Sequence, residues 1–179
     1  MSEVHKNILI AYYSRSGNNY VGGSIVNLSV GNTEVIAKMI QEMVGGDLFK
    51  IETVDSYPED YTQATEVAQS ELNMGARPEL STHLENIDKY DIIFIGYPNW
   101  WGTMPMPVFT FFEEYNLSGK VIIPFCTHEG SGLSRSVKDI EKLNPNSEVI
   151  PALAIRGGSV KSPSTRKSVE MWLKDNDIL

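Results

Sequence analysis

An unbroken apolar run, Ile8 to Ala11, constrains this chain more than any other stretch. A strand that is apolar without alternation must be covered on both faces, which is typical of the parallel sheets of α/β proteins. The run ends at Tyr12, and after a polar loop Gly31-Asn32-Thr33-Glu34 opens a helix that is predicted to reach Met43. A buried strand, a loop and an amphipathic helix predict the first unit of a βα alternation.

The loop Ser14-Arg15-Ser16-Gly17-Asn18 brings hydroxyl groups and glycine to the start of that helix. Free backbone N–H groups and the helix dipole favour an anion at a helix N-terminus, and phosphate is the favoured occupant. The loop contains neither Gly-Lys-Ser/Thr nor G-x-G-x-x-G, which leaves a terminal monophosphate as the favoured ligand. A second interpretation stays open, in which Asn32 or Thr33 caps the helix and no ligand binds.

Residues 19–30 separate the two halves of this loop, so Ser14–Asn18 and Gly31–Thr33 would have to converge in space. The segment is long for a βα connection and is interpreted as an insertion. Beside a phosphate it could cover a ligand, because long loops of this kind are often functional. Equally, its apolar residues from Ile25 to Val30 could form a short hairpin that contacts no ligand.

The rest of the chain continues the alternation. Further strands are predicted at 48–52, 91–96, 120–126 and 149–155, and helices at 60–75, 105–115, 133–143 and from Ser162-Pro163 onward. The helix at 60–75 has few apolar positions and is expected to be half-buried, and Pro124 predicts a bulge or a break in strand pairing. Five strands separated by helices predict a parallel sheet covered on both faces, with ligands beyond the carboxyl ends of its strands.

Two later loops carry unusual residues at those carboxyl ends. Tyr97-Pro98-Asn99-Trp100-Trp101-Gly102 follows the third strand, and Cys126-Thr127-His128-Glu129-Gly130-Ser131-Gly132 follows the fourth. Two adjacent tryptophans in such a loop cannot easily face the same core, so at least one is expected to face a ligand or partner. The alternative is one tryptophan in the core and one covering a loop.

Composition limits the remaining possibilities. At 179 residues and 41% hydrophobic content, residues 1–179 are expected to form a single domain with one well-buried core. A net charge of -8 without a basic cluster argues against nucleic acid. The favoured interpretation of this charge is that it aids solubility, and the alternative is that it steers basic protein partners. Cys126 is the only cysteine, so no disulfide can form within the chain, and no metal site is expected.

The first six residues lack the apolar core of a secretory signal, and no run is long enough to span a membrane. We therefore expect a cytoplasmic protein.

Taken together, the three loops resemble the flavodoxin family over nearly the whole chain, and most closely the flavodoxin-like proteins with Gly-Tyr-Pro-x-Trp-Trp-Gly followed by Pro-Met-Pro. The resemblance implies a doubly wound, five-stranded parallel sheet with strand order 2-1-3-4-5, helices on both faces, and FMN as a non-covalent cofactor. It implies that the 5′-phosphate is held by Ser14, Ser16, Gly17, Asn18, Asn32 and Thr33. It further implies that the isoalloxazine ring is flanked by Pro98, Asn99, Trp100, Trp101 and Gly102 on one side and by Thr127, His128, Glu129, Gly130 and Gly132 on the other.

The resemblance implies a redox protein, and we expect electron transfer between protein partners. The alternative is an FMN-dependent NAD(P)H oxidoreductase that acts on a quinone or another small-molecule electron acceptor, and a third is a module that binds some other phosphorylated ligand. The loop after the fourth strand lacks the tyrosine that many flavodoxins stack on the ring, so that face is open or is covered by Tyr20. No catalytic residue is assigned. His128 is interpreted as bonded to backbone in preference to a general acid, and Cys126 as a buried apolar residue.

Overall fold

The computed structural model describes residues 6–179, and its centre is a parallel sheet. Residues 1–5, on which the expectation of no secretory signal rests, lie outside the described residues. The strands of the sheet are β1 (Ile8–Tyr12), β4 (Asp47–Lys50), β5 (Ile92–Pro98), β6 (Val121–His128), β7 (Glu148–Val149) and β8 (Leu153–Arg156). They lie in the order β4-β1-β5-β6-β7, and β8 pairs with β6 further along the same strand.

The edge beyond β6 corrects the prediction of five strands in the order 2-1-3-4-5. Numbered along the chain, the first four strands of this sheet do lie as 2-1-3-4, but the fifth position is shared by the two short strands β7 and β8. The register shifts between them, because Ile122 pairs with Val149 whereas Phe125 pairs with Leu153. Pro124 lies opposite the gap and has no N–H to donate, which explains the break that was expected there.

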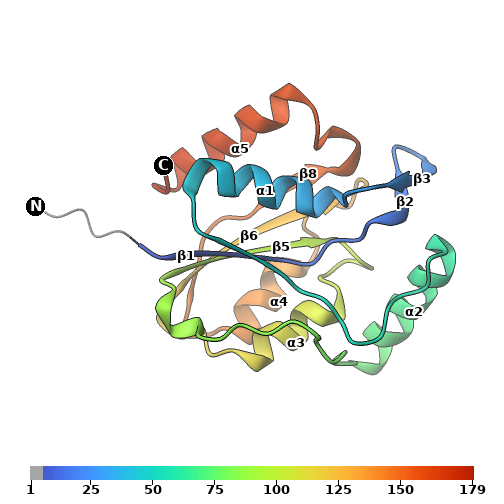
Figure 1. Cartoon of the computed structure of the whole chain (residues 1–179), viewed down its shortest axis with the longest axis horizontal. Coiled ribbons are helices and arrows are strands. Elements are labelled where there is room, and N and C mark those ends of the chain that lie inside the picture. Colours follow the sequence, from blue (N-terminus) through green and yellow to red (C-terminus); the bar gives the residue numbers. More distant parts are fainter. Residues whose placement is uncertain (1–5) are drawn as a thin grey trace, which may run out of the picture.

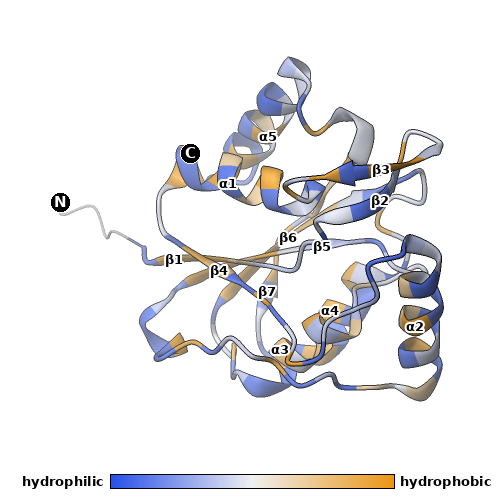
Figure 2. Ribbon diagram, turned by 45° about the vertical axis from the view of Figure 1, so that its right-hand side comes forward, coloured by the Kyte–Doolittle hydropathy of each residue, from blue (hydrophilic) through white to orange (hydrophobic). Residues whose placement is uncertain are grey.

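Four helices cover the two faces of the sheet (Figure 1). They are α1 (Asn32–Val44) and α5 (Pro163–Asp175) on one face, and α3 (Met106–Glu114) and α4 (Ser136–Leu143) on the other. Successive residues of β1 belong to different core clusters, Leu9 to that of α3 and α4 and Ile10 to that of α1 and α5. Figure 2 shows apolar residues on the strands and on the helices beside them, and strand residues belong to both buried clusters. The sheet is therefore buried on both faces, as its uninterrupted apolar runs predict.

The insertion forms a two-stranded antiparallel hairpin of its own, β2 (Gly17–Val21) and β3 (Ser24–Leu28). Gly22 and Gly23 make the turn, with φ angles of 62° and 90°. Positive φ at both turn residues defines the type I′ turn that fits the twist of a hairpin and favours glycine. The hairpin begins at Gly17 rather than at 19.

Helix α2 (Tyr61–Met74) lies with the hairpin at the end of the molecule where β1 and β5 finish, rather than on a face of the sheet (Figure 1). It buries only Ala64 and Ala68, which confirms the expectation of a half-buried helix. Two short 3-10 helices complete the chain, η1 (Ile87–Lys89) and η2 (Gly157–Ser159).

The predicted cap of the first helix and the predicted start of the fourth are wrong. Gly31 is the N-cap of α1, so neither Asn32 nor Thr33 has that position. Gly31 has no side chain to cap the helix, and Ser14 Oγ of the preceding loop accepts a hydrogen bond from Glu34 N instead, at 3.1 Å. Helix α4 begins at Ser136 rather than at 133, because Ser134 has a left-handed φ of 47° that interrupts the helix. Among residues 6–179, no helix has both the length and the apolar character needed to cross a membrane.

Candidate functional site

The loops that follow β1, β5 and β6 meet at the carboxyl edge of the sheet. Thr33, in the first turn of α1, shares a hydrogen bond of 2.7 Å with Thr127 near the end of β6, between their Oγ1 atoms. The backbone N–H of Asn99, just after β5, donates to the carbonyl of the same Thr127 at 2.9 Å. Segments distant in sequence therefore converge where an α/β sheet binds ligands.

Two hollows that share part of their walls form a groove at this edge. The threonine hollow, of about 320 Å³, is lined by Thr33, Thr127 and Trp100 among others. The tryptophan hollow, of about 330 Å³, is lined by Trp100, Trp101 and the small side chains of α2. The residues common to both are Arg15, Asn19, Tyr61, Asn99, Trp100 and Ser131. Such a groove has the size and the mixed polar and aromatic lining of a cofactor site.

The first turn of α1 offers donors to an anion. Gly31 approaches Ser14 and Arg15 so closely that a Cβ there would lie 2.2 Å from Ser14 Oγ and 2.5 Å from the Arg15 carbonyl oxygen. As a glycine, Gly31 also places no side-chain oxygen over the helix end. Within residues 6–179, no oxygen accepts from the backbone N–H groups of Asn32 and Thr33. The donor set at this helix end therefore fits a phosphate.

The Thr33–Thr127 pair adds another donor in the same place. Both residues are buried, with 1% and 4% of their surface exposed. One hydroxyl donates to the other, so a single O–H remains with no acceptor among the described residues. A ligand oxygen in the threonine hollow would accept from it.

The expected phosphate residues are divided between two places. Asn32 and Thr33 line the threonine hollow, whereas Ser14 and Ser16 line a separate hollow beside Lys50 and Tyr57. Gly17 and Asn18 belong to β2. The Asn18 side chain is already used, because its Oδ1 accepts from Tyr61 N at 2.7 Å.

The tryptophan loop turns sharply after β5. Trp101 and Gly102 have φ angles of 56° and 86°, and Trp100 and Thr103 exchange backbone hydrogen bonds across the turn. The Trp100 ring packs edge-to-face against Tyr13 and Tyr57, at 5.2 Å from each, and also lines both hollows. Trp101 is 49% exposed, and its indole N–H donates to the Thr65 carbonyl of α2. Both tryptophans face the groove, and Trp100 also packs against the core.

Asn99 fixes the spacing between the two later loops. Its Nδ2 donates to the carbonyl of Gly132 at 2.8 Å, and its Oδ1 accepts from Gly102 N at 3.0 Å. The preceding Pro98 is the last residue of β5 and lines the threonine hollow. One side chain thus holds both flanks of the groove, and this role does not follow from sequence spacing.

The loop after β6 begins later than predicted, because Thr127 and His128 still belong to the strand. His128 Nδ1 accepts from Gly130 N at 2.9 Å, and burial followed by the charge of Arg156 holds the pKa of its imidazole below the usual value. This hydrogen bond matches the interpretation of His128 as a histidine bonded to backbone. Cys126 is buried, and burial raises the pKa of its thiol to about 12, as expected for an inert apolar position.

Glu129 joins this loop to the hairpin. Its Oε2 accepts from Gly22 N at the tip of the hairpin, at 3.0 Å. Gly157 lies against the same carboxylate, since a Cβ there would be 2.3 Å from Glu129 Oε1 and 2.6 Å from Asn32 Nδ2. The hairpin is therefore tied to the loop after β6 beside the threonine hollow, which Tyr20 of β2 also lines.

Arg15 and Tyr61 line both hollows but were not among the predicted site residues. Arg15 lies between two serines that were selected, so its position was a usable signal, whereas nothing in the sequence relates Tyr61 of α2 to the first loop. Tyr20 stacks on Tyr61 with ring centroids 6.0 Å apart and also lines the threonine hollow. Burial raises the pKa of the Tyr61 hydroxyl, which is neutral at pH 7.

We compared the chain with protein-family models, curated proteins and solved structures. A family model described as Flavodoxin matches residues 7–176. A search of curated proteins gave no match.

Solved structures share the fold along nearly their whole length. A protein from Bacteroides eggerthii DSM 20697 is 28% identical with a TM-score of 0.77, over 96% of this chain and 98% of that one. A flavoprotein from Lactobacillus acidophilus NCFM, solved in complex with FMN, is 24% identical with a TM-score of 0.67, over 93% and 98%. An NADPH-quinone reductase from P. pentosaceus is 12% identical with a TM-score of 0.54, over 96% and 97%.

Proposed function

Because the chain belongs to the flavodoxin family, we propose that it binds FMN in the groove and acts in electron transfer. The observation that carries the proposal is the Thr33–Thr127 hydroxyl pair, which joins the donor-rich end of α1 to the carboxyl end of β6 in a hollow that Trp100 also lines. A ligand that fits must have an anion at one end and a flat aromatic group near it, and FMN has both. The solved complex of the Lactobacillus flavoprotein with FMN supports the choice of cofactor.

The second half of the phosphate loop would hold the phosphate. Asn32 and Thr33 offer their backbone N–H groups, and the Thr33–Thr127 pair offers one hydroxyl proton. Ser14 contributes indirectly, because its Oγ accepts from Glu34 N and so fixes the loop against the helix end. These donors are neutral, as are the successive backbone N–H groups that form anion sites in other proteins.

The tryptophan hollow would hold the ring. Trp100 presents an aromatic wall backed by Tyr13 and Tyr57, and Ala64 and Ala68 of α2 leave room opposite. Asn99 accepts from Gly102 N and donates to Gly132 O, and so holds the tryptophan loop and the loop after β6 on either side of the ring. Bound there, FMN would supply a ring that takes up and releases electrons.

An absorbance titration tests the proposal. The purified chain with added FMN should show a shifted flavin spectrum and quenched flavin fluorescence, and it should bind riboflavin, which lacks the phosphate, more weakly. A protein that leaves the FMN spectrum unchanged would contradict FMN binding.

The alternative function is FMN-dependent oxidation of NAD(P)H, with a quinone as the electron acceptor. The likeness in fold to the NADPH-quinone reductase from P. pentosaceus is the reason to test it. Tyr20 and Tyr61 stand at the groove and narrow the room in which a nicotinamide could stack, so electron transfer is favoured. Stepwise reduction with dithionite and a steady-state assay with NADPH and a quinone distinguish the two. A one-electron-reduced species without NADPH turnover supports the carrier.

We also assign, as part of this proposal, redox proteins as partners and the cytoplasm as the location. The net charge of -8 suits association with basic partners, and the reduced thiol of Cys126 suits a reducing compartment.

A further inference from the structure

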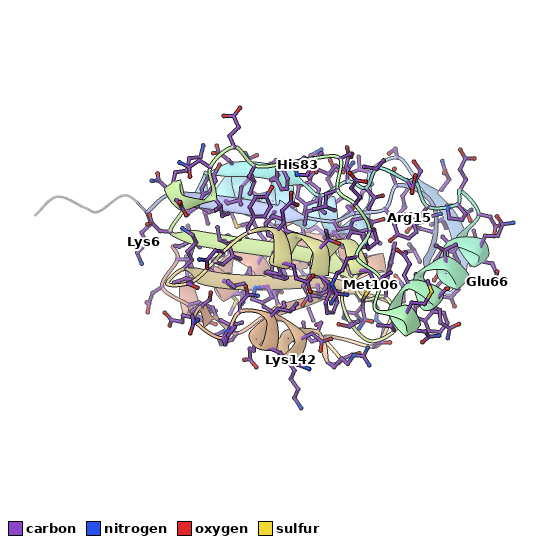
Figure 3. All side chains as sticks on the ribbon, turned by 90° about the horizontal axis from the view of Figure 1, so that it is seen from below. Lys6, Arg15, Glu66, His83, Met106 and Lys142 are labelled. Atoms are coloured by element: carbon purple, nitrogen blue, oxygen red, sulfur yellow. The ribbon has the colours of Figure 1, made fainter. Side chains whose placement is uncertain are left out.

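Arg15 is held in a fixed position at the groove by three backbone carbonyls. Its Nε donates to Asn18 O at 2.9 Å, and its Nη2 donates to Pro58 O at 2.9 Å and Glu59 O at 2.8 Å. The side chain lies at the end of the molecule that carries α2, opposite Lys6 (Figure 3). These contacts join the first loop to the segment that leads into α2, and they restrict the guanidinium to one place.

These contacts fix the guanidinium without neutralising it. Arg77, Arg135 and Arg166 each pair with a carboxylate, on Glu113, Asp139 and Glu42. Among the ion pairs of residues 6–179, none includes Arg15. Carbonyl oxygens carry no net charge, so Arg15 keeps a full positive charge.

Arg15 lines the hollow in which we propose that the flavin ring lies. Arg15 is the one charged residue among the described residues that line the tryptophan hollow. The threonine hollow also contains the carboxylate of Glu129, but that group accepts from Gly22 N and does not line the tryptophan hollow. The charged group that lines the tryptophan hollow is therefore a cation, whereas the nearest carboxylate of the groove, on Glu129, lies in the neighbouring hollow.

We propose that Arg15 stabilises the reduced cofactor over the oxidised one and so raises its midpoint potential; this inference rests on the proposed function. Two electrons from a donor and one proton from water leave the ring with one more negative charge than oxidised FMN. A fixed cation attracts that additional charge and has little effect on the neutral oxidised ring. The overall charge of -8 acts in the opposite direction, but solvent and salt screen charges on distant surfaces.

The test compares three variants of the full chain loaded with FMN. Arg15→Gln removes the charge and keeps a donor, and Arg15→Lys keeps the charge without the forked contacts. Arg166→Gln removes the same charge from α5, where Arg166 pairs with Glu42 at 2.7 Å and does not line the groove. Fluorescence titration gives the dissociation constant of oxidised FMN. An equilibrium titration with dithionite, which is oxidised to sulfite, gives the midpoint potential and hence the constant of the reduced form.

Arg15→Gln should weaken binding of reduced FMN at least about 10-fold more than binding of oxidised FMN, which lowers the two-electron midpoint by about 30 mV. Arg15→Lys should retain most of the native midpoint, Arg166→Gln all of it, and 1 M salt should reduce the effect of Arg15→Gln. Equal weakening of both redox forms by Arg15→Gln, with an unchanged midpoint, would show a structural role only and overturn the inference while FMN binding stands. Failure of the native chain to bind FMN would overturn the proposed function and this inference with it.

Discussion

Helices α1 and α2 both begin beside the groove, but only α1 leaves its N-terminus available to a ligand. At α2 the Asp60 carboxylate accepts from Gln63 N at 2.9 Å, and Asn18 Oδ1 accepts from Tyr61 N. At α1 the cap is Gly31, and Asn32 N and Thr33 N have no acceptor within residues 6–179. A helix end binds an anion only where the chain does not already satisfy it, so the two ends differ in function because of their caps.

The two helices also differ in how firmly they are held. Helix α1 buries Thr33, Ile36, Ala37 and Ile40 against the sheet, whereas α2 buries only two alanines. Helix α2 and the segment that leads into it are positioned instead by single hydrogen bonds, from Arg15, Asn18 and Trp101. The side of the groove formed by α1 is therefore set by the core, whereas the side formed by α2 depends on a few hydrogen bonds and little buried surface.

The largest effect is expected from closing the open end of α1. Gly31→Ala would place a Cβ 2.5 Å from a backbone oxygen, so the loop must move, which should cost about 3 kcal/mol of unfolding free energy and abolish the preference for FMN over riboflavin. Urea unfolding and the two flavin titrations measure this. Gly158→Ala is the matched control, because the nearest atom to its added Cβ lies at 3.9 Å. Native-like behaviour of Gly31→Ala would contradict the close approach.

The buried hydroxyl pair gives the next largest effect. Thr33→Val leaves the Thr127 hydroxyl buried without its partner, which should cost about 2 kcal/mol and reduce the FMN-to-riboflavin affinity ratio about 10-fold. Thr33→Ser keeps the hydroxyl and should restore the ratio.

The double variant Thr33→Val/Thr127→Val separates stability from binding. With both hydroxyls removed, no polar group is left unsatisfied. The double variant should therefore lose less unfolding free energy than the two single variants lose together, while its preference for FMN over riboflavin stays low. Additive losses in urea unfolding would show that the two side chains do not act as a pair.

A smaller effect is expected at the capped end of α2. Asp60→Ala removes the bond to Gln63 N and should lower stability by about 1 kcal/mol, with no change in the FMN-to-riboflavin ratio. Asp60→Asn retains an acceptor and serves as the control. A changed ratio in Asp60→Ala would mean that the α2 end also contacts phosphate.

The smallest expected effect is on the pH dependence of stability, because one carboxyl group on each helix has its pKa shifted, in opposite directions. Burial would raise the pKa of Glu34 on α1, but hydrogen bonds and charges from Lys38 and Lys50 outweigh it and hold the pKa below its usual 4.5. Burial raises the pKa of Glu71 on α2 above 4.5, with only partial relief from the hydrogen bond of Tyr57. The stabilisation from Glu34 is therefore present above pH 4.5 and lost as pH falls through its folded pKa, whereas Glu71 makes stability fall as pH rises from 4.5 through its folded pKa.

Urea unfolding between pH 3 and 8 checks these opposite slopes. Glu34→Gln should flatten the loss of stability on the acid side, and Glu71→Gln should flatten the decline above 4.5. The same change of slope in both variants would contradict the opposite pKa shifts.

Much of the fold was predictable because burial leaves a direct pattern in sequence. The apolar runs of β1, β5 and β6 identified the central strands, and the sparse apolar positions of α2 identified a helix of low burial. The division of the last strand into β7 and β8 was less predictable, since it depends on Pro124 lying opposite the gap in the assembled sheet.

The candidate site was predictable in its location and less so in its contacts. The three loops meet as their positions after parallel strands require. The direction of each side chain depends on neighbours distant in sequence: Asn18 binds α2, and Arg15 reaches Pro58 and Glu59. Tyr61 came to the groove through the placement of a helix with no sequence signal linking it to the first loop.

The sequence by itself determined the α/β alternation, the buried strands and the edge of the sheet where polar loops collect, because hydrophobic burial is local in its pattern. Only the tertiary structure decided which helix end stays open, where the charge of Arg15 lies and which hydroxyls pair. Those features depend on hydrogen bonds between segments such as Thr33 and Thr127, which adopt their geometry only once the sheet has brought them together.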